Sequence, residues 1–367
     1  MAKSKTFDYK SDWFQYFEGV LKNEYKDDED FQNKIKANIV ESNYSSIKDF
    51  EKSHKEIKLI PSKETTFYNI QFKGQRKTPH YLYLDIEDER FWVIHNIESQ
   101  EEILAKINDI FCKSYLQDHI YIPNQMMEKY WTDYSQDSMG VGLTFDQLFL
   151  EEEDQFSFGS EEDFEYNIDF TLRLWPKRRN TMKFILKKFK EIDLPINFSY
   201  LNYIFQNENN EILMKENFFR DGRFTVEKGI DLYKHIKFID KIKEDYSSKI
   251  NIIEENRVDW EKCKGEIFRI NFQKKIDPNT VVSILKKNFS IFRIFLFYLY
   301  RSKDYYFYEC LDEHTGGKFG LQIFDNKIYI NIDSQSCGNL IMRLFTNLQN
   351  HLSPDLKLEI DNHESIL

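Results

Sequence analysis

Four short strands joined by tight turns near the carboxyl end constrain the fold of this chain more than any other sequence feature. Apolar runs predict these strands over Ile291–Tyr300, Tyr305–Leu311, Lys318–Phe324 and Lys327–Ile332. Polar residues and glycines at positions 302–304, 314–317 and 325–326 mark the turns between them. Strands joined by such short connections run antiparallel, so we expect an antiparallel meander here.

Helical signals on both sides of the meander predict a layer that packs on it. Asp277 and Pro278 are a typical N-cap and first helical residue, and the helix they open should run to about Asn288, after a strand at Glu266–Phe272. A second helix is expected at Cys337–Asn350, before a last strand at Leu356–Ile360. Residues 318–360 therefore read strand, strand, helix, strand, and residues 80–122 read the same way at nearly the same length.

This weak internal β-β-α-β echo predicts an α+β protein of two or three units, with antiparallel sheets each covered by helices on one face. We divide the chain into an acidic α+β domain at 1–135, an acidic linker at 136–165, a basic helix-rich segment at 166–260 and a second α+β domain at 261–367. The expected helices before residue 261 lie at about 12–23, 35–40, 99–111, 181–191 and 228–250, and the expected strands at 67–72, 81–86, 90–95, 119–122, 166–174 and 198–205.

Large side chains dominate the composition, with 33 Phe and 22 Tyr against 12 Gly and three Ala. Few positions therefore allow the close backbone approach that phosphate-cradling loops need, which disfavours glycine-rich cofactor folds. The four cysteines are far apart and the eight histidines lack metal-ligand spacing, so we expect free thiols, no metal and no cofactor. The polar start of the chain and the interruption of its longest apolar run by Arg293 favour a cytoplasmic protein without a membrane partner.

Charge is segregated along the chain, which is acidic overall with a formal net charge of -11. Residues 1–165 carry 19 Lys and Arg against 34 Asp and Glu, whereas residues 166–303 carry 28 against 18. The last 64 residues are acidic again, with 4 against 10. Such asymmetry predicts that the middle of the chain attracts an anionic partner.

The basic residues of that middle segment form two stripes on helical wheels, opposite apolar faces. Each lysine could contact a phosphate as a point charge, although the more common role of such lysines is an ordinary solvated helix face or a protein-partner surface. The candidate phosphate-contacting residues are Lys177, Arg178, Arg179, Lys183, Lys187 and Lys190 in and before the first helix, and Lys234, Lys237 and Lys241 in the second. Asp240 and Asp245 partly neutralise the second stripe.

Tyrosines on the first hairpin of the meander could stack on bases, and we include Tyr298, Tyr300 and Arg301 in the candidate nucleic-acid site. Because strands alternate faces, only about half of the hairpin tyrosines should point outward together. Arg293 and Arg301 interrupt apolar strands, so a carboxylate or an anionic ligand should pair with each of them if it is buried.

Catalytic motifs are absent from the sequence, apart from a loose match to a metal-dependent nuclease in Asp49 and the Glu56-Ile57-Lys58 triplet. The sequence therefore favours a non-enzymatic binding protein whose basic middle contacts nucleic acid, DNA or RNA, or another polyanion. Two alternatives stay open at this point. One is an acidic, inhibitor-type protein whose N-terminal half binds a basic protein partner, and the other is the nuclease.

Overall fold

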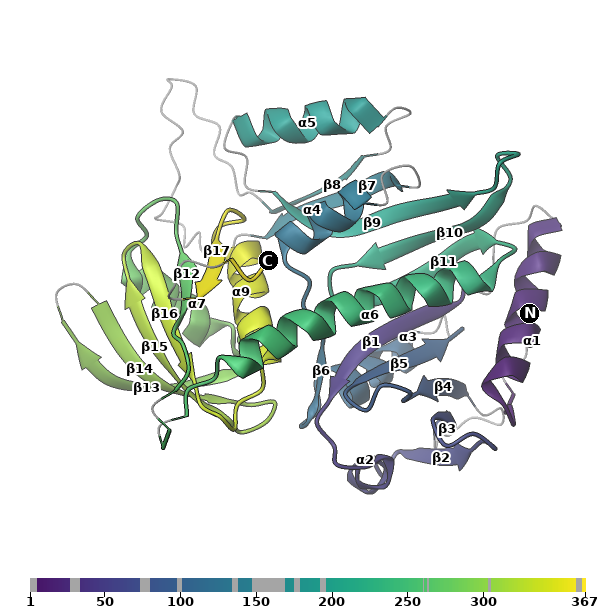
Figure 1. The fold of residues 1–367 in the computed structure, drawn as a ribbon, viewed down its shortest axis with the longest axis horizontal. Helices are drawn as coiled ribbons and strands as arrows, with labels where there is room; N and C mark the ends of the chain where they lie inside the picture. Colours follow the sequence, from purple (N-terminus) through teal and green to yellow (C-terminus); the bar gives the residue numbers. More distant parts are fainter. Residues whose placement is uncertain are drawn as a thin grey trace. The chain divides into compact units, whose positions relative to one another are not determined.

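The chain folds into two antiparallel sheets, one of eleven strands and one of six, together with helices, which confirms the predicted α+β class (Figure 1). The computed structural model describes residues 5–26, 34–72, 80–97, 101–133, 138–146, 169–174, 179–191, 196–259, 261–262, 264–302, 305–360 and 365–367. No helix among them is long and apolar enough to cross a membrane.

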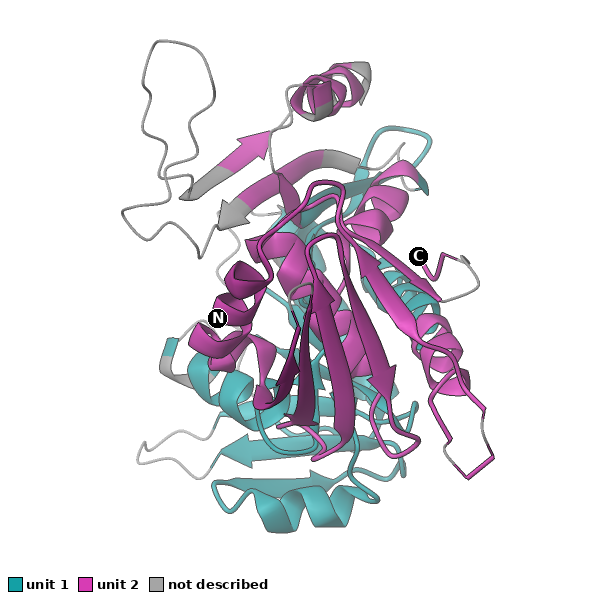
Figure 2. Ribbon diagram, turned by 90° about the vertical axis from the view of Figure 1, so that its left-hand side faces the viewer, with its two compact units in different colours: residues 1–120, 133–139, 200–247 teal, residues 121–132, 140–199, 248–367 magenta. Residues whose placement is uncertain are grey.

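Two compact units make up the fold, and each is discontinuous in sequence (Figure 2). Unit 1 contains residues 1–120, 133–139 and 200–247, and unit 2 contains residues 121–132, 140–199 and 248–367. These units cut across the four consecutive segments expected from the sequence, because strands from the middle of the chain return to the sheet of unit 1.

The sheet of unit 1 is built around strand β1, which is buried along almost its whole length. Its strands run in the order β2-β3-β4-β5-β1-β11-β10-β9, and β6 also pairs with β1. Their bounds are β1 Lys36–Ser42, β2 Ile57–Pro61, β3 Phe67–Phe72, β4 Tyr81–Asp85, β5 Phe91–Asn96, β6 Gln117–His119, β9 Asn197–Gln206, β10 Ile212–Phe219 and β11 Arg223–Gly229. The helices are α1 Lys10–Lys26, α2 Ile47–Ser53, α3 Glu101–Ile107 with the π-helix η1 Asn108–Cys112, and α6 Leu232–Glu255, of which residues 232–247 belong to unit 1.

Helices cover both faces of this sheet, not one face as expected. On one face Phe50 of α2 packs against Trp92 and Phe111, with ring centroids 5.4 and 5.2 Å apart. On the other face Trp13 of α1 packs against Tyr83 of β4, and residues of α6 contact β5. Aromatic side chains thus hold a helical layer on each side of the sheet.

Unit 2 has a six-stranded sheet in the order β13-β14-β15-β16-β12-β17. The strands are β12 Phe268–Asn271, β13 Ile294–Arg301, β14 Tyr305–Asp312, β15 Lys318–Phe324, β16 Lys327–Ile332 and β17 Lys357–Ile360. Three helices lie between these strands in the sequence: α7 Pro278–Lys287, α8 Phe289–Phe292 and α9 Asn339–His351. The same unit contains α4 Asn124–Asp133 (up to Thr132), α5 Arg179–Glu191 and the pairing of β7 Ser138–Asp146 with β8 Asp169–Leu174.

One topology occurs in both units. Unit 1 runs strand β1, helix α2, the meander β2 to β5, a helical segment and strand β6, and unit 2 runs β12, α7, the meander β13 to β16, α9 and β17. In both, the first strand pairs antiparallel with the last strand of the meander and with the final strand. The echo between 80–122 and 318–360 is therefore the second half of a larger β-α-β4-α-β repeat.

Several expected elements differ in the structure. Residues 35–40 were expected to be helical, but residues 36–40 belong to strand β1. The expected linker contains strand β7, and its residues 147–165 lie outside the described residues. The sequence patterns missed β10 and β11, and Phe289–Phe292 form a helical turn before β13 begins at Ile294.

Candidate nucleic-acid interface

The two faces of the six-stranded sheet differ sharply in exposure. On the inner face, side chains such as Ile294, Tyr308 and Leu321 are buried, and α7 packs against this sheet. On the other face, every side chain is half-buried or exposed. Among the elements that the structure describes, no helix of unit 2 lies in front of this second face (Figure 2).

We call this second face the open face and define it by register, because directly paired residues in an antiparallel sheet lie on the same side. It consists of Phe295, Phe297 and Tyr300 on β13, Tyr305, Phe307, Glu309 and Leu311 on β14, Lys318, Gly320, Gln322 and Phe324 on β15, Lys327, Tyr329 and Asn331 on β16, Arg269 and Asn271 on β12, and Lys357 and Glu359 on β17.

Four aromatic rings form a continuous row across the open face, which we call the aromatic ladder. Tyr300 and Tyr305 lie with ring centroids 6.1 Å apart, and Tyr305 stacks on Phe324 at 4.9 Å. Phe324 meets Tyr329 edge to face at 5.7 Å. The ladder therefore spans β13 to β16 at one end of the sheet and presents ring surfaces that a planar ligand can stack on.

Cationic side chains accompany the ladder. The ammonium group of Lys327 lies 4.9 Å from the ring centroid of Tyr329 and 5.9 Å from that of Phe324. Elsewhere on the open face, Arg269 binds Glu359 at 2.8 Å, and Lys318 lies 3.9 Å from Glu309. Lys327 is thus the positive charge that sits directly over the ladder.

The three hairpin residues predicted from the sequence do not lie together. Tyr300 belongs to the ladder, whereas Tyr298 pairs with the buried Tyr308 and Arg301 lies over the ring of Tyr306, both on the inner-face side. A β-bulge between Tyr298 and Tyr300 causes the difference, because it shifts the alternation of the strand by one residue. Both Tyr298 and Tyr300 are more than half exposed.

The predicted basic residues of the first stripe lie in or before α5 of unit 2. Lys183 and Lys187 are exposed, and Lys187 lies 3.9 Å from Glu191, which also binds Lys188 at 2.5 Å. Lys177 and Arg178 lie outside the described residues, as do the side chains of Arg179 and Lys190 within the helix. Glu191 therefore partly neutralises the positive charge around Lys187.

The second stripe lies on the part of α6 that belongs to unit 1. Lys241 binds Asp245 at 2.8 Å, and the ammonium group of Lys237 lies 4.6 Å from the ring centroid of Tyr233. Lys234 is half-buried. An acidic residue of the same helix thus binds Lys241, as the sequence suggested, whereas the neighbour of Lys237 is an aromatic ring.

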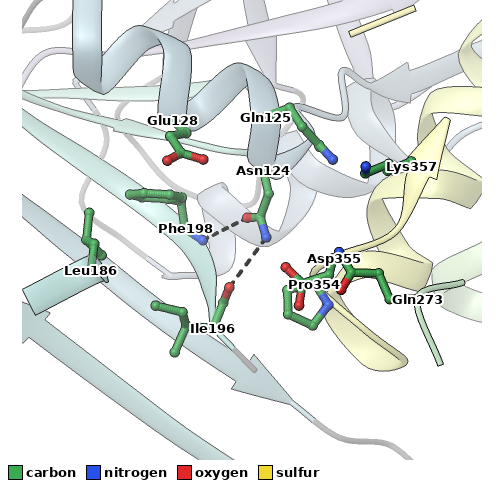
Figure 3. Close-up of a pocket in the computed structure, with 10 residues that line it drawn as sticks. All are labelled: Asn124, Gln125, Glu128, Leu186, Ile196, Phe198, Gln273, Pro354, Asp355 and Lys357. Atoms are coloured by element: carbon green, nitrogen blue, oxygen red, sulfur yellow. Dashed lines mark hydrogen bonds between the residues drawn. The ribbon is translucent and has the colours of Figure 1, made fainter. Parts of the chain in front are cut away.

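A cavity of about 400 Å³ lies within unit 2, where α4 meets the start of β9, whose residues up to Ser199 belong to this unit, and the approach to β17 (Figure 3). Its amide side chains are used in internal hydrogen bonds: Asn124 donates to Asn197 Oδ1 at 2.6 Å and accepts from the Phe198 backbone at 3.0 Å. Gln125 donates to the Leu356 carbonyl. We interpret the polar wall of this cavity as a structural joint between elements rather than a ligand site.

Other charged residues singled out from the sequence have structural roles. Arg293 is buried and its Nε donates to Glu313 at 2.9 Å, so its predicted carboxylate partner is confirmed. Asp49 lies at the start of helix α2 and accepts hydrogen bonds from Ser46, Ser45 and Lys52, which hold its pKa at about 2. A nuclease of the expected type needs this carboxylate on a strand, and here it belongs to a helix cap.

These features define a class: an α+β protein with two copies of one β-α-β4-α-β topology, one of which has an open aromatic sheet face. The chain belongs to the family of MJECL33-like proteins, whose profile matches residues 1–367. It is 25% identical over 395 aligned positions to the "Uncharacterized protein MJECL33" of Methanocaldococcus jannaschii, covering 95% of this chain and 93% of that protein. No solved structure matches the chain significantly.

Proposed function

We propose that this protein binds single-stranded nucleic acid on the open face of its six-stranded sheet. The aromatic ladder of Tyr300, Tyr305, Phe324 and Tyr329 is the observation that carries the proposal. Aromatic side chains on a solvent-facing sheet stack on unpaired bases, and a duplex offers no such base surface. Lys327 would supply a phosphate contact beside the stacked bases.

The comparison with unit 1 supports this reading of the ladder. In unit 1 the equivalent face is formed by residues such as Phe67, Tyr83 and His95, all buried, and α1 covers it through Trp13. In unit 2 the rings on the same face of the same topology stay accessible. Aromatic surface of this kind on a soluble domain commonly marks a binding site.

The test is fluorescence anisotropy with labelled mixed-sequence oligonucleotides, as single-stranded DNA, single-stranded RNA and duplex DNA. We expect a single strand to bind more tightly than the duplex, and the DNA and RNA arms identify the preferred polymer. Tyr329→Ala and Tyr305→Ala should each weaken binding by about 1–3 kcal/mol, roughly fivefold to 150-fold, because each removes one stacking surface.

Tyr298→Ala is the control, since this tyrosine is as exposed as Tyr300 of the ladder but faces the inner side of the sheet. It should bind like the unchanged protein. Equal loss in Tyr298→Ala and Tyr329→Ala, or no binding of any oligonucleotide at low salt, contradicts the proposal. In the second case the inhibitor-type alternative, with a basic protein as partner, becomes the hypothesis to test.

A further inference from the structure

The outer edge of β13 is the most apolar exposed segment of unit 2. Among the described residues, no strand pairs with this edge, because β13 is the first strand of the sheet. Its exposed apolar and aromatic side chains are Phe295, Phe297, Tyr298, Leu299 and Tyr300, with exposed fractions between 44% and 56%. A strand that merely borders one open face would expose alternate residues, whereas β13 exposes apolar groups on both faces.

The opposite edge of the same sheet, strand β17, is covered by another segment of the chain. Beyond β17, the end of the chain adds an antiparallel bridge between Glu359 and Ser365, and the Ile366 backbone donates to the Leu358 carbonyl. Proteins protect free edges with charges, prolines or covering segments. β-bulges also protect edges, and β13 has one between Tyr298 and Tyr300. Before this bulge, from Ile294 to Tyr298, β13 has neither a charge nor a proline, so this stretch of the edge is unprotected.

We propose that a second copy of this chain covers the edge, with the two β13 strands pairing antiparallel about a two-fold axis. Self-pairing places the same apolar residues of both copies against each other, on both faces of the joined sheet. It also closes after two copies, because neither β13 strand then keeps a free edge. The result is a continuous twelve-stranded sheet made from two six-stranded ones.

Charge favours this occupant and this orientation. Arg301 is the one charged residue of β13, at its carboxyl end. Antiparallel pairing puts the two copies of Arg301 at opposite ends of the contact, whereas parallel pairing would put like charges side by side, which is destabilising. A strongly charged peptide would find no opposite charge along the apolar remainder of the strand.

The dimer does not depend on the proposed nucleic-acid site. Tyr305, Phe324 and Tyr329 lie on strands inside the sheet, so edge pairing leaves their rings accessible. Pairing would instead bring the two ladders onto one continuous surface. Loss of the dimer and loss of nucleic-acid binding can therefore be measured separately.

Light scattering coupled to size exclusion, over a wide range of protein concentration, tests the dimer. We expect the unchanged chain to have twice its 44.6 kDa mass. Phe297→Lys should raise the dimer dissociation constant at least about tenfold, because it loses buried apolar area and opposes two like charges. Tyr115→Lys is the control, since it places the same charge on a 61% exposed side chain of unit 1, and it should remain a dimer.

Leu299→Lys is a second variant at a 51% exposed position, and circular dichroism identifies any variant that fails to fold. A monomer at every concentration of the unchanged chain overturns the proposal. A dimer that persists in both folded lysine variants overturns it as well, since the contact then lies elsewhere. A monomeric Phe297→Lys that still binds an oligonucleotide supports the edge contact and leaves the ladder proposal intact.

Discussion

Burial decides the chemistry of the titratable side chains in the core of unit 1. His235 Nδ1 and Glu216 Oε2 lie 2.6 Å apart, and both side chains are fully buried. Burial raises the pKa of the Glu216 carboxyl. Nearby, the His95 ring packs 4.6 Å from Trp13, and burial, followed by the positive charges of neighbouring residues, holds its pKa well below 6.5. His95 is therefore neutral in the folded protein and becomes charged in the unfolded chain as the pH falls.

This difference predicts that the free energy of unfolding decreases as the pH falls below about 6.5. In that range His95 binds a proton in the unfolded chain but stays neutral in the folded protein. His95→Phe keeps a ring against Trp13 and removes the proton site. We expect it to reduce the slope of unfolding free energy against pH by up to about 1.4 kcal/mol per pH unit. Urea unfolding of both proteins between about pH 5 and pH 8 measures this slope; equal slopes contradict the assignment.

At the scale of elements, two glycines in tight turns have the same backbone conformation and different surroundings. Gly222 joins β10 to β11 with a φ of 77°, and a Cβ there would meet Ile120 Cγ1 at 2.4 Å. Gly316 lies at the tip between β14 and β15 with a φ of 73°, and a Cβ would meet nothing within 4 Å. Substitution of Gly316 therefore measures the cost of backbone strain alone, and substitution of Gly222 measures strain together with a steric clash.

We expect Gly316→Ala to cost about 1 kcal/mol, the usual penalty of a side chain in the left-handed region. Gly222→Ala should cost clearly more, because the clash with Ile120 adds to the same strain. Midpoints of chemical unfolding compare the two variants directly. Equal losses would show that the Ile120 side chain moves aside without cost.

Turn and cap chemistry is local, so the sequence predicts it well: the turn at 220–223 and the cap Asp277 are both in the structure. Strand β1 was missed for a physical reason. It is a central strand that is buried on both faces, so its apolar run lacks alternation and is ambiguous between helix and strand.

The candidate site could be predicted only in part. Tyr300 was found because it lies in an aromatic hairpin, but strict alternation puts Tyr298 beside it, and the bulge that separates them has no clear signal in the sequence. Phe324 and Tyr329 join the ladder through cross-strand register. Register depends on how two strands pair, so it cannot be predicted from the pattern of one segment alone.

At the scale of the whole molecule, the two units share one topology, but the equivalent sheet face is buried in unit 1 and accessible in unit 2. Unit 1 surrounds its sheet with helices on both sides, and its equivalent face becomes core. Among the described residues of unit 2, no helix covers the aromatic face of the six-stranded sheet, which stays accessible. The acidic charge of the chain, -11 overall, opposes nucleic acid at long range, so stacking rather than charge must provide much of the affinity we propose.

Salt dependence of binding tests this balance. A ladder site with the lysines of the open face, Lys318, Lys327 and Lys357, predicts a slope of log affinity against log salt of roughly -2, at about 0.7 for each phosphate neutralised on a single strand. The six candidate basic residues in and before α5, without Lys188, would instead predict roughly -4. Lys327→Gln should make the slope shallower by roughly 0.7, whereas Lys183→Gln should leave it unchanged. The reverse pattern would assign binding to the basic helix, because a lysine changes the slope only if it contacts a phosphate.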